Sequence, residues 1–190
     1  NAGVRLEVES DYPHGNCWCG VLRVAAGARV DRLGFRIPGW SRHTAIRRDG
    51  IDAGPATPGT YWYGTGDWQD GDRIEIIFDF TPRIWRGEQD CAGMVSLYRG
   101  PVLLAADRRY NRELTLPPPG QEYTRFELNL PPLSGDWTLH PVPAAEWPDW
   151  LTPEQLWDVA LADGRKLRLC DFASAGQTGR AYRSWLPTEA

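Results

Sequence analysis

Short segments in which apolar and polar residues alternate dominate this chain, and residues that favour turns separate them. Residues 4–9 (VRLEVE), 20–24 (GVLRV) and 33–38 (LGFRIP) follow this pattern, and residues 73–80 (RIEIIFDF) give its strongest form. A period of two places successive side chains on opposite faces of a strand. Turn signals return about every eight to twelve residues, as they do in two-sheet β-domains. The pattern predicts an all-β protein: an antiparallel, jelly-roll-like β-sandwich with a second, smaller β lobe.

A change in composition near Asp107 predicts where the two lobes divide. We assign residues 1–105 to the main sandwich. The following sequence is rich in Pro and Trp, with PPPG at residues 117–120 and PP at residues 131–132, and residues 106–170 are predicted to form the smaller lobe. The C-terminal segment, residues 171–190, contains a predicted closing strand near residues 182–186 and is a candidate to return to the first sandwich.

One segment, residues 152–157 (TPEQLW), carries the signals of a helix start. Thr152 can cap the first turn through its hydroxyl oxygen, and Pro153 suits the first helical position because its missing N–H would have no partner there. The sequence therefore predicts a single short helix among the strands.

Charge and hydropathy exclude two classes of partner. The 190 residues carry a formal net charge of −4, and Lys and Arg are mixed with Asp and Glu rather than gathered into a basic stripe. A nucleic acid is therefore not an expected partner. No apolar run reaches the roughly 18 residues of a membrane span. We expect a soluble protein with no membrane partner, and favour the cytoplasm.

The four cysteines allow more than one interpretation. They are too few for a disulfide scaffold in a chain that can build a core, and a Cys91–Cys170 disulfide stays open. His14, Cys17 and Cys19 lie close together, and a strand would direct both thiols to one face, which makes them a weak candidate for a zinc site. The second paired cluster of a structural zinc site is missing. Buried or half-buried thiols are therefore the preferred interpretation.

No residue stands out as catalytic. A glycosidase uses two carboxylates about 5–10 Å apart, and Asp67, Asp70 and Asp72 are close in sequence. They surround a glycine in a predicted turn, where Asp is favoured for turn geometry alone, so we interpret them as turn residues. No Gly-x-Ser-x-Gly motif is present, and the histidines have no evident triad partners. An independent enzyme is accordingly the least favoured interpretation.

The ten tryptophans are the remaining feature with a functional interpretation. Indole rings can stack on the apolar C–H faces of sugars. Trp147 and Trp150 lie in a Pro-rich loop, which favours exposure, and they are the candidate substrate-binding residues. The alternative, which we favour, is that the tryptophans fill the core or an interface with a neighbouring domain.

Several strings, in their order and spacing, resemble the C-terminal part of glycoside hydrolase family 127 proteins, the family of β-L-arabinofuranosidases. They are DYP at residues 11–13, FRIPGW at 35–40, WQDGD at 68–72, YRGPV at 98–102, and the closing segment from DFASAG at 171–176 to YRSWL at 182–186. The combination is more specific than any one string, and it covers most of the chain.

The resemblance implies that an N-terminal (α/α)6 barrel carries the active site, where a zinc ion held by Cys and Glu supports a cysteine nucleophile. β-Sandwich domains follow that barrel in the family. Asn1 would then lie just past the barrel, and the barrel would be the missing partner of this chain. Zinc would belong to the barrel, with no cofactor in this chain. The family's adjacent cysteine pair differs from Cys17 and Cys19 in spacing and place, so no catalytic or zinc-ligand residue is carried over.

We therefore expect a non-catalytic accessory β-sandwich region of a glycoside hydrolase that supports the catalytic barrel or makes the contacts of a homodimer. The alternative is a carbohydrate-binding module that uses exposed tryptophans. Exposed, nearly coplanar rings would favour the second function, and buried rings the first.

Overall fold

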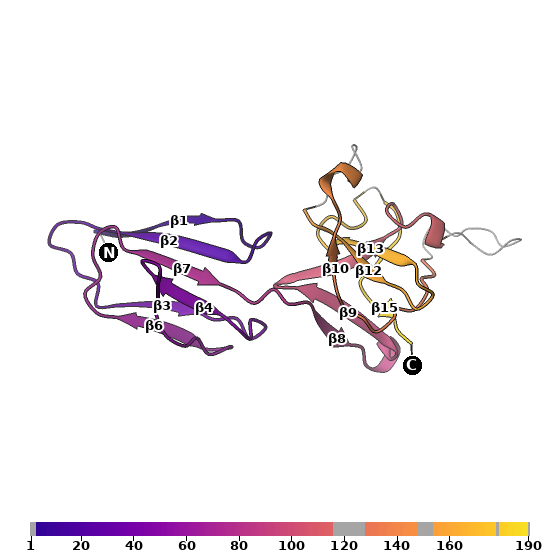
Figure 1. Ribbon diagram of the computed structural model, residues 1–190, viewed down its shortest axis with the longest axis horizontal. Helices are drawn as coiled ribbons and strands as arrows, with labels where there is room; N and C mark the ends of the chain where they lie inside the picture. The colour runs from indigo at the N-terminus through magenta and orange to yellow at the C-terminus, as the bar shows by residue number, and fades with distance from the viewer. Residues whose placement is uncertain (1–2, 116–127, 148–153, 178, 190) are drawn as a thin grey trace, which may run out of the picture. The chain divides into compact units, whose positions relative to one another are not determined.

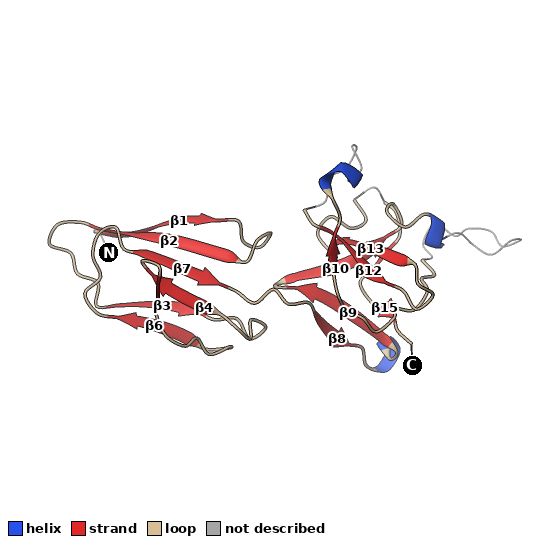
Figure 2. Cartoon of the chain, in the orientation of Figure 1, coloured by secondary structure: helices blue, strands red, loops and turns tan. Residues whose placement is uncertain are grey.

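The computed structural model describes residues 3–115, 128–147, 154–177 and 179–189. The chain divides into two compact units, residues 1–81 and 82–190, and each has its own core. Strands dominate both units, and the helical elements in the described ranges are short 3-10 turns: η1 (Gln89–Cys91), η2 (Glu113–Thr115) and η3 (Ala144–Glu146) (Figure 2). None of these turns is long and apolar enough to cross a membrane. The predicted all-β, antiparallel fold is confirmed.

The first unit is a sandwich of two antiparallel sheets (Figure 1). The larger sheet contains, in spatial order, β1 (Val4–Ser10), β2 (Cys17–Val24), β7 (Arg73–Ile77), β4 (Ala45–Arg48) and β5 (Ile51–Asp52). The smaller sheet is the pair β3 (Arg32–Arg36) and β6 (Tyr61–Thr65). Apolar side chains from both sheets form one core; they include Leu22, Ile46, Ile74, Ile76, Leu33, Phe35 and Trp62.

Strand β7 illustrates how the sequence sets these layers. Ile74 and Ile76 are buried in the core, whereas Arg73 is exposed and Glu75 half-buried on the opposite face of the strand. Burying an isoleucine side chain contributes about 1.5–3 kcal/mol. A shift of register by one residue would bring Glu75, together with Arg73 or Ile77, to the core in place of the two isoleucines. The alternation therefore fixes both the strand and its register.

The second unit is built on one antiparallel sheet of eight strands. Its main path runs through β11 (His140–Pro141), β12 (Leu156–Ala160), β13 (Lys166–Asp171), β10 (Val102–Asp107), β9 (Met94–Arg99) and β15 (Leu186–Pro187). In addition, β14 (Tyr182–Arg183) pairs with β10, and β8 (Arg83–Arg86) pairs with β9. Leucines dominate the core; those buried include Leu97, Leu104, Leu133, Leu161, Leu167, Leu169 and Leu186.

The boundary between the units differs from the predicted one at residue 105. The first unit ends at Thr81 and the second begins at Pro82. Strand β10 belongs with the later residues because it pairs with β13, where Leu104 lies opposite Asp171. Pairing between segments so far apart in sequence leaves no signal in local composition. The Pro-rich sequence after residue 107 marks loops within one unit, so residues 106–170 are not a lobe of their own.

The C-terminal segment pairs with β9 and β10, which were predicted as part of the first sandwich but belong to the second unit. Residues 171–190 add strands to the second unit, where Leu186 pairs with Val95 of β9. The predicted helix at residues 152–157 is wrong where the structure describes it: Trp157 lies in β12, opposite Leu169. The capping residues Thr152 and Pro153 fall outside the described residues. Cross-strand pairing with β13 outweighs a local capping signal here.

Candidate functional site

The three aspartates weighed as carboxylates of a glycosidase serve a turn in the first unit. Asp70 Oδ1 accepts a hydrogen bond from the Val24 N–H at 2.9 Å. Asp72 Oδ2 accepts one from Arg48 Nη2 at 2.5 Å, and the same nitrogen donates to the backbone carbonyl of Asp67 at 2.7 Å. These contacts close the turn that leads into β7, which accounts for aspartate at these positions.

The candidate zinc ligands do not form a cluster suited to a metal. Cys17 and Cys19 lie on one face of β2, where Cys19 is buried and Cys17 half-buried. Burial raises the pKa of the Cys17 thiol, which opposes the thiolate form that binds zinc. His14 is exposed in the preceding turn. Within the described ranges, no group of three or more His, Cys, Asp or Glu side chains is placed to hold a metal ion. All four cysteines are free, so Cys91 and Cys170 do not form a disulfide.

Of the two predicted sugar-binding tryptophans, Trp150 lies outside the described residues. Trp147 follows η3 and is half-buried, and its Nε1 donates a hydrogen bond to the Val142 carbonyl at 2.9 Å. Its ring packs against a small cluster that contains Val142, Leu156 and Cys170. Part of the ring surface is therefore occupied by the protein itself. Substrate binding by Trp147 stays a prediction.

Other aromatic side chains are more exposed. Trp85 of β8 is 63% exposed, and Tyr61 and Tyr63 of β6 are 54% and 50% exposed. The tyrosine ring centroids are 6.0 Å apart with planes at 19°, and the Arg32 guanidinium lies 4.5 Å from the centroid of the Tyr63 ring. The exposure of Tyr61 and Tyr63 could have been predicted from the sequence. Because Trp62 faces the core, its two neighbours on the strand must face outward.

The second unit buries a network of charged and polar groups that sequence reasoning missed. Asp107, the last residue of β10, pairs with Arg109 at 2.6 Å, and their side chains are 0% and 2% exposed. Asp107 also accepts hydrogen bonds from the Gly176 and Arg109 backbone N–H groups, each at 2.8 Å. Arg109 Nη2 donates to the Ser174 carbonyl at 2.6 Å. These extra hydrogen bonds replace part of the solvation that both charges lose on burial, while Arg109 Nε and Nη1 have no hydrogen-bond partner among the described residues.

Asp171, the last residue of β13, organises a neighbouring loop in the same way. Its Oδ2 accepts hydrogen bonds from the N–H groups of Glu154 at 2.9 Å and Gln155 at 3.2 Å, and its Oδ1 accepts one from the Ser174 N–H at 2.8 Å. The residue is 3% exposed. Both buried carboxylates are thus surrounded by backbone donors, an arrangement that stabilises loops and leaves no face for a substrate.

Two further groups beside this network have strongly raised pKa values. Burial raises the pKa of the Tyr110 hydroxyl to about 12 and that of the Cys170 thiol to about 12, and in Cys170 the negative charge of Asp107 adds to the effect. Both groups therefore stay neutral near pH 7. Neither has the ionised form that a nucleophile at this position would need.

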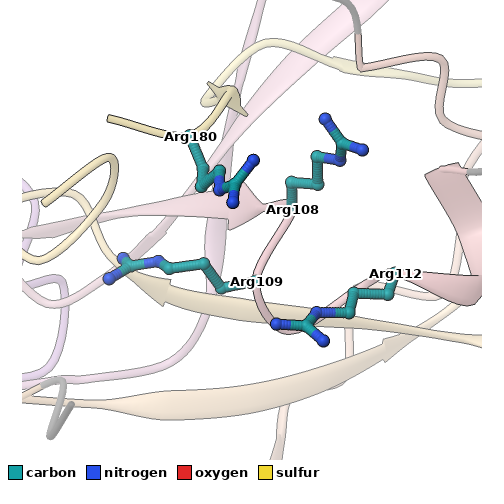
Figure 3. Close-up of a pocket in the computed structure, with 4 residues that line it drawn as sticks. All are labelled: Arg108, Arg109, Arg112 and Arg180. Carbon is teal, nitrogen blue, oxygen red and sulfur yellow. The ribbon is translucent and has the colours of Figure 1, made fainter. Parts of the chain in front are cut away.

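A pocket of about 310 Å³ lies in the same unit and is lined by Arg108, Arg109, Arg112 and Arg180. Figure 3 shows the four side chains around a common space, with Arg108 and Arg180 on one side and Arg109 and Arg112 on the other. The Arg108 N–H donates to the Ala181 carbonyl at 3.1 Å, which joins the two segments that carry the arginines. We call this the arginine pocket. Three of the four arginines belong to the string DRRYNR at residues 107–112, which is the feature of the sequence that could have indicated the pocket.

Comparison with known families identifies the first unit. A family profile described as beta-L-arabinofuranosidase, GH127 middle domain, matches residues 1–80. This region is a GH127 domain. The match ends at the boundary between the two units. No curated protein matches the chain.

Solved GH127 structures extend the likeness in fold to the second unit. A glycoside hydrolase superposes with a TM-score of 0.71 at 20% identity, and a GH127 beta-arabinofuranosidase with 0.64 at 17%. A GH127 beta-L-arabinofuranosidase from Geobacillus stearothermophilus T6 gives 0.65 at 19%. Each alignment covers 98% of this chain and 31–32% of the other. The chain therefore spans about a third of the length of these structures.

The expected placement and the matching profile name different parts of the GH127 family. The resemblance pointed to the C-terminal part of the family, whereas the matching profile is that of the middle domain. The strings at residues 11–13, 35–40 and 68–72 lie within the match, and those at residues 98–102 and 171–186 lie beyond it. Individual strings located the family, but they did not distinguish its successive β domains.

Proposed function

We propose that this chain is a non-catalytic accessory region of a GH127-type glycoside hydrolase and that it supports a catalytic (α/α)6 barrel in the same protein. The observation that carries the proposal is the extent of the structural match: nearly the whole chain aligns with only a third of each relative. A further two thirds of such a protein is available to hold the active site and its zinc ion.

The exposed aromatic side chains suit this supporting role. Interfaces between domains are enriched in aromatic residues, which bury a large apolar area at a small cost in side-chain entropy. Trp85 in the second unit and the Tyr61–Tyr63 pair in the first are exposed on strands and accessible to a neighbouring domain. A second copy of the chain is the alternative occupant of these surfaces.

Activity measurements on the chain and on its parent protein test the proposal. The purified 190-residue chain is expected to fold and to release no product from an aryl β-L-arabinofuranoside. The protein encoded by the complete reading frame is expected to hydrolyse that substrate and to lose solubility or thermal stability when residues 1–190 are deleted. Hydrolysis by the isolated chain, or a parent protein that is unaffected by the deletion, would contradict the accessory role.

A carbohydrate-binding module is the second candidate, and the exposure of Trp85, Tyr61 and Tyr63 is the observation that favours it. Isothermal titration with arabinose-containing oligosaccharides tests it. Saturable binding that Trp85→Ala or Tyr63→Ala abolishes would establish this function. Trp147→Ala belongs in the same series because that residue was predicted from the sequence. Absence of binding to the unaltered chain would reject the module.

A further inference from the structure

We propose that a hollow on the open side of the first unit binds a neutral sugar. The hollow has a volume of about 530 Å³ and lies between β6 and the hairpin formed by β4 and β5. Ligand sites in proteins commonly measure about 300–1,000 Å³. We call it the β5–β6 hollow. The proposal rests on the second candidate function, a carbohydrate-binding module, and gives that module a site.

The unpaired edge of β6 forms one wall of the hollow. Among the described strands β6 pairs with β3 alone, so its other edge has no strand partner. The carbonyl of Thr60, just before β6, faces β3, since it accepts a hydrogen bond from the Ile37 N–H at 2.8 Å. Backbone groups alternate in direction along an antiparallel strand, so the N–H and C=O groups of Tyr63 and Thr65 face the open edge. Both residues line the hollow, where these groups can meet the hydroxyls of a ligand.

An indole ring provides the apolar surface of the site. Trp62 is half-buried and lines the hollow, and its ring packs on Phe35 with centroids 6.2 Å apart. A Cβ on Gly64 would lie 2.5 Å from ring atoms of Trp62 and Trp68, so glycine is what allows both indoles to line the hollow. The Arg48 guanidinium covers Trp68 at 4.0 Å from the ring centroid. Trp62 is therefore the ring on which the C–H face of a sugar can pack.

Two aspartates of the β4–β5 hairpin provide hydrogen-bond acceptors. Asp52 is exposed; its Oδ1 accepts a hydrogen bond from the Gly54 N–H at 2.7 Å, and its Oδ2 has no hydrogen bond with any residue that the structure describes. Asp49 Oδ1 accepts one from the Arg73 N–H at 2.9 Å, and its side chain is 50% exposed. A sugar hydroxyl that donates to a carboxylate forms a charge-assisted hydrogen bond. The exposed Thr65 hydroxyl can act as donor or acceptor beside them.

The charge of the lining indicates a neutral ligand. Within the described lining Arg48 is the one cation, and Asp72 balances its charge through an ion pair at 2.5 Å. Asp49 and Asp52 therefore leave an excess of negative charge in the hollow. An acidic sugar would bring a like charge to it, which lowers affinity. The hydroxyl groups of a neutral sugar would instead use the carboxylates as acceptors.

Isothermal titration of the purified chain tests the proposal with arabinotriose, a neutral trisaccharide, and with trigalacturonate, an acidic one. We expect saturable binding of arabinotriose, and binding of trigalacturonate that is weaker by about tenfold or more. Asp52→Ala is expected to weaken arabinotriose binding about tenfold, because it removes a charge-assisted hydrogen bond. Asp52→Asn keeps an acceptor and should lose less affinity. Both variants alter an exposed side chain, and their circular dichroism spectra verify that the fold is retained.

Asp31→Ala is the matched control, because Asp31 is an exposed aspartate of the same unit outside the hollow. It should bind arabinotriose as the unaltered chain does. Equal weakening in Asp31→Ala and Asp52→Ala, or trigalacturonate binding as tight as that of arabinotriose, would overturn the proposal.

Two further outcomes separate the hollow from the functions already proposed. Arabinotriose binding that Trp85→Ala abolishes and Asp52→Ala leaves intact would retain the carbohydrate-binding module and reject the hollow as its site. Absence of sugar binding, together with self-association in light scattering that Thr65→Lys abolishes, would reject both and assign the open edge of β6 to a second copy of the chain. Neither outcome bears on the accessory role, which the activity of the parent protein tests.

Discussion

The two units of this chain differ in what they bury. Among the described residues, the first unit encloses an apolar core and one buried polar side chain, that of Ser41. The second unit buries Ser96, Asp107, Arg109, Asn111, Gln155, Asp171 and Ser174 in addition to its leucine core. The first unit therefore depends mainly on complementary packing of two sheets, whereas the second also contains a polar network in which buried charged groups are held by hydrogen bonds.

The ion pairs of the two units differ in how deeply they are buried, and not in the number of charges they contain. In the first unit, Glu7 forms ion pairs with Arg5 and Arg23 on an exposed strand face. Exposed pairs contribute about 0–1 kcal/mol, because water screens them and holding two long side chains has an entropic cost. In the second unit, the side chains of the Asp107–Arg109 pair are almost completely buried. Removing one partner of such a pair leaves an uncompensated charge in the interior.

The largest effect is expected for Asp107→Ala. It leaves the Arg109 guanidinium buried without its counter-ion and removes an acceptor from the Gly176 N–H, so the second unit should lose about 3–5 kcal/mol of unfolding free energy. Hydrogen exchange measured by mass spectrometry should show faster exchange in peptides from residues 82–190, with peptides from residues 3–81 unchanged. Asp163→Ala, which alters an exposed ion pair in the second unit, is the control. Equal acceleration in both variants would contradict the distinction.

An intermediate effect is expected for Gly64→Ala in the first unit. A Cβ at this position would lie 2.5 Å from ring atoms of both Trp62 and Trp68, so the core must shift to admit it. Overpacking of this kind costs about 1–3 kcal/mol. Gly39→Ala is the matched control, since its added Cβ meets only the Gly59 Cα at 3.9 Å. Urea unfolding followed by tryptophan fluorescence should show the difference, and two variants of equal stability would refute close packing around Gly64.

The same contrast explains which features the sequence could predict. Strands β1, β2 and β7 were predicted because each places an apolar side chain at every second position, and the core requires that pattern. The unit boundary after Thr81 was missed because it depends on pairing between β10 and β13. Such pairing joins segments that carry no mark of one another in the sequence.

The polar network was missed for a different reason. Asp107, Arg109 and Asp171 are residue types that occupy surfaces in most proteins, and nothing local distinguishes a buried copy from an exposed one. Their burial follows from the way the loops at residues 107–112 and 171–176 fold back on β10 and β13. By contrast, the exposure of Tyr61 and Tyr63 could have been predicted, because alternation about the core residue Trp62 directs both outward.

The smallest effect concerns an exposed charge in the second unit, and it tests whether burial is what makes the Asp107–Arg109 pair important. Asp163 lies in the turn between β12 and β13, where its Oδ2 accepts hydrogen bonds from Arg165 Nε at 2.9 Å and Nη2 at 2.6 Å. These hydrogen bonds lower the pKa of the Asp163 carboxyl. A lowered pKa in the folded state means that the contact contributes stability above the ordinary Asp pKa and loses it as the pH falls through the folded value.

An NMR titration of the Asp163 carboxyl carbon measures this shift directly. We expect its midpoint to lie below the ordinary Asp value, to rise in Arg165→Gln, and to stay low in Lys166→Gln, which removes a neighbouring exposed charge. Stability at pH 7 should change little in Arg165→Gln, because an exposed pair is screened by solvent. A loss of stability comparable with that of Asp107→Ala would mean that burial is not what makes the Asp107–Arg109 pair important.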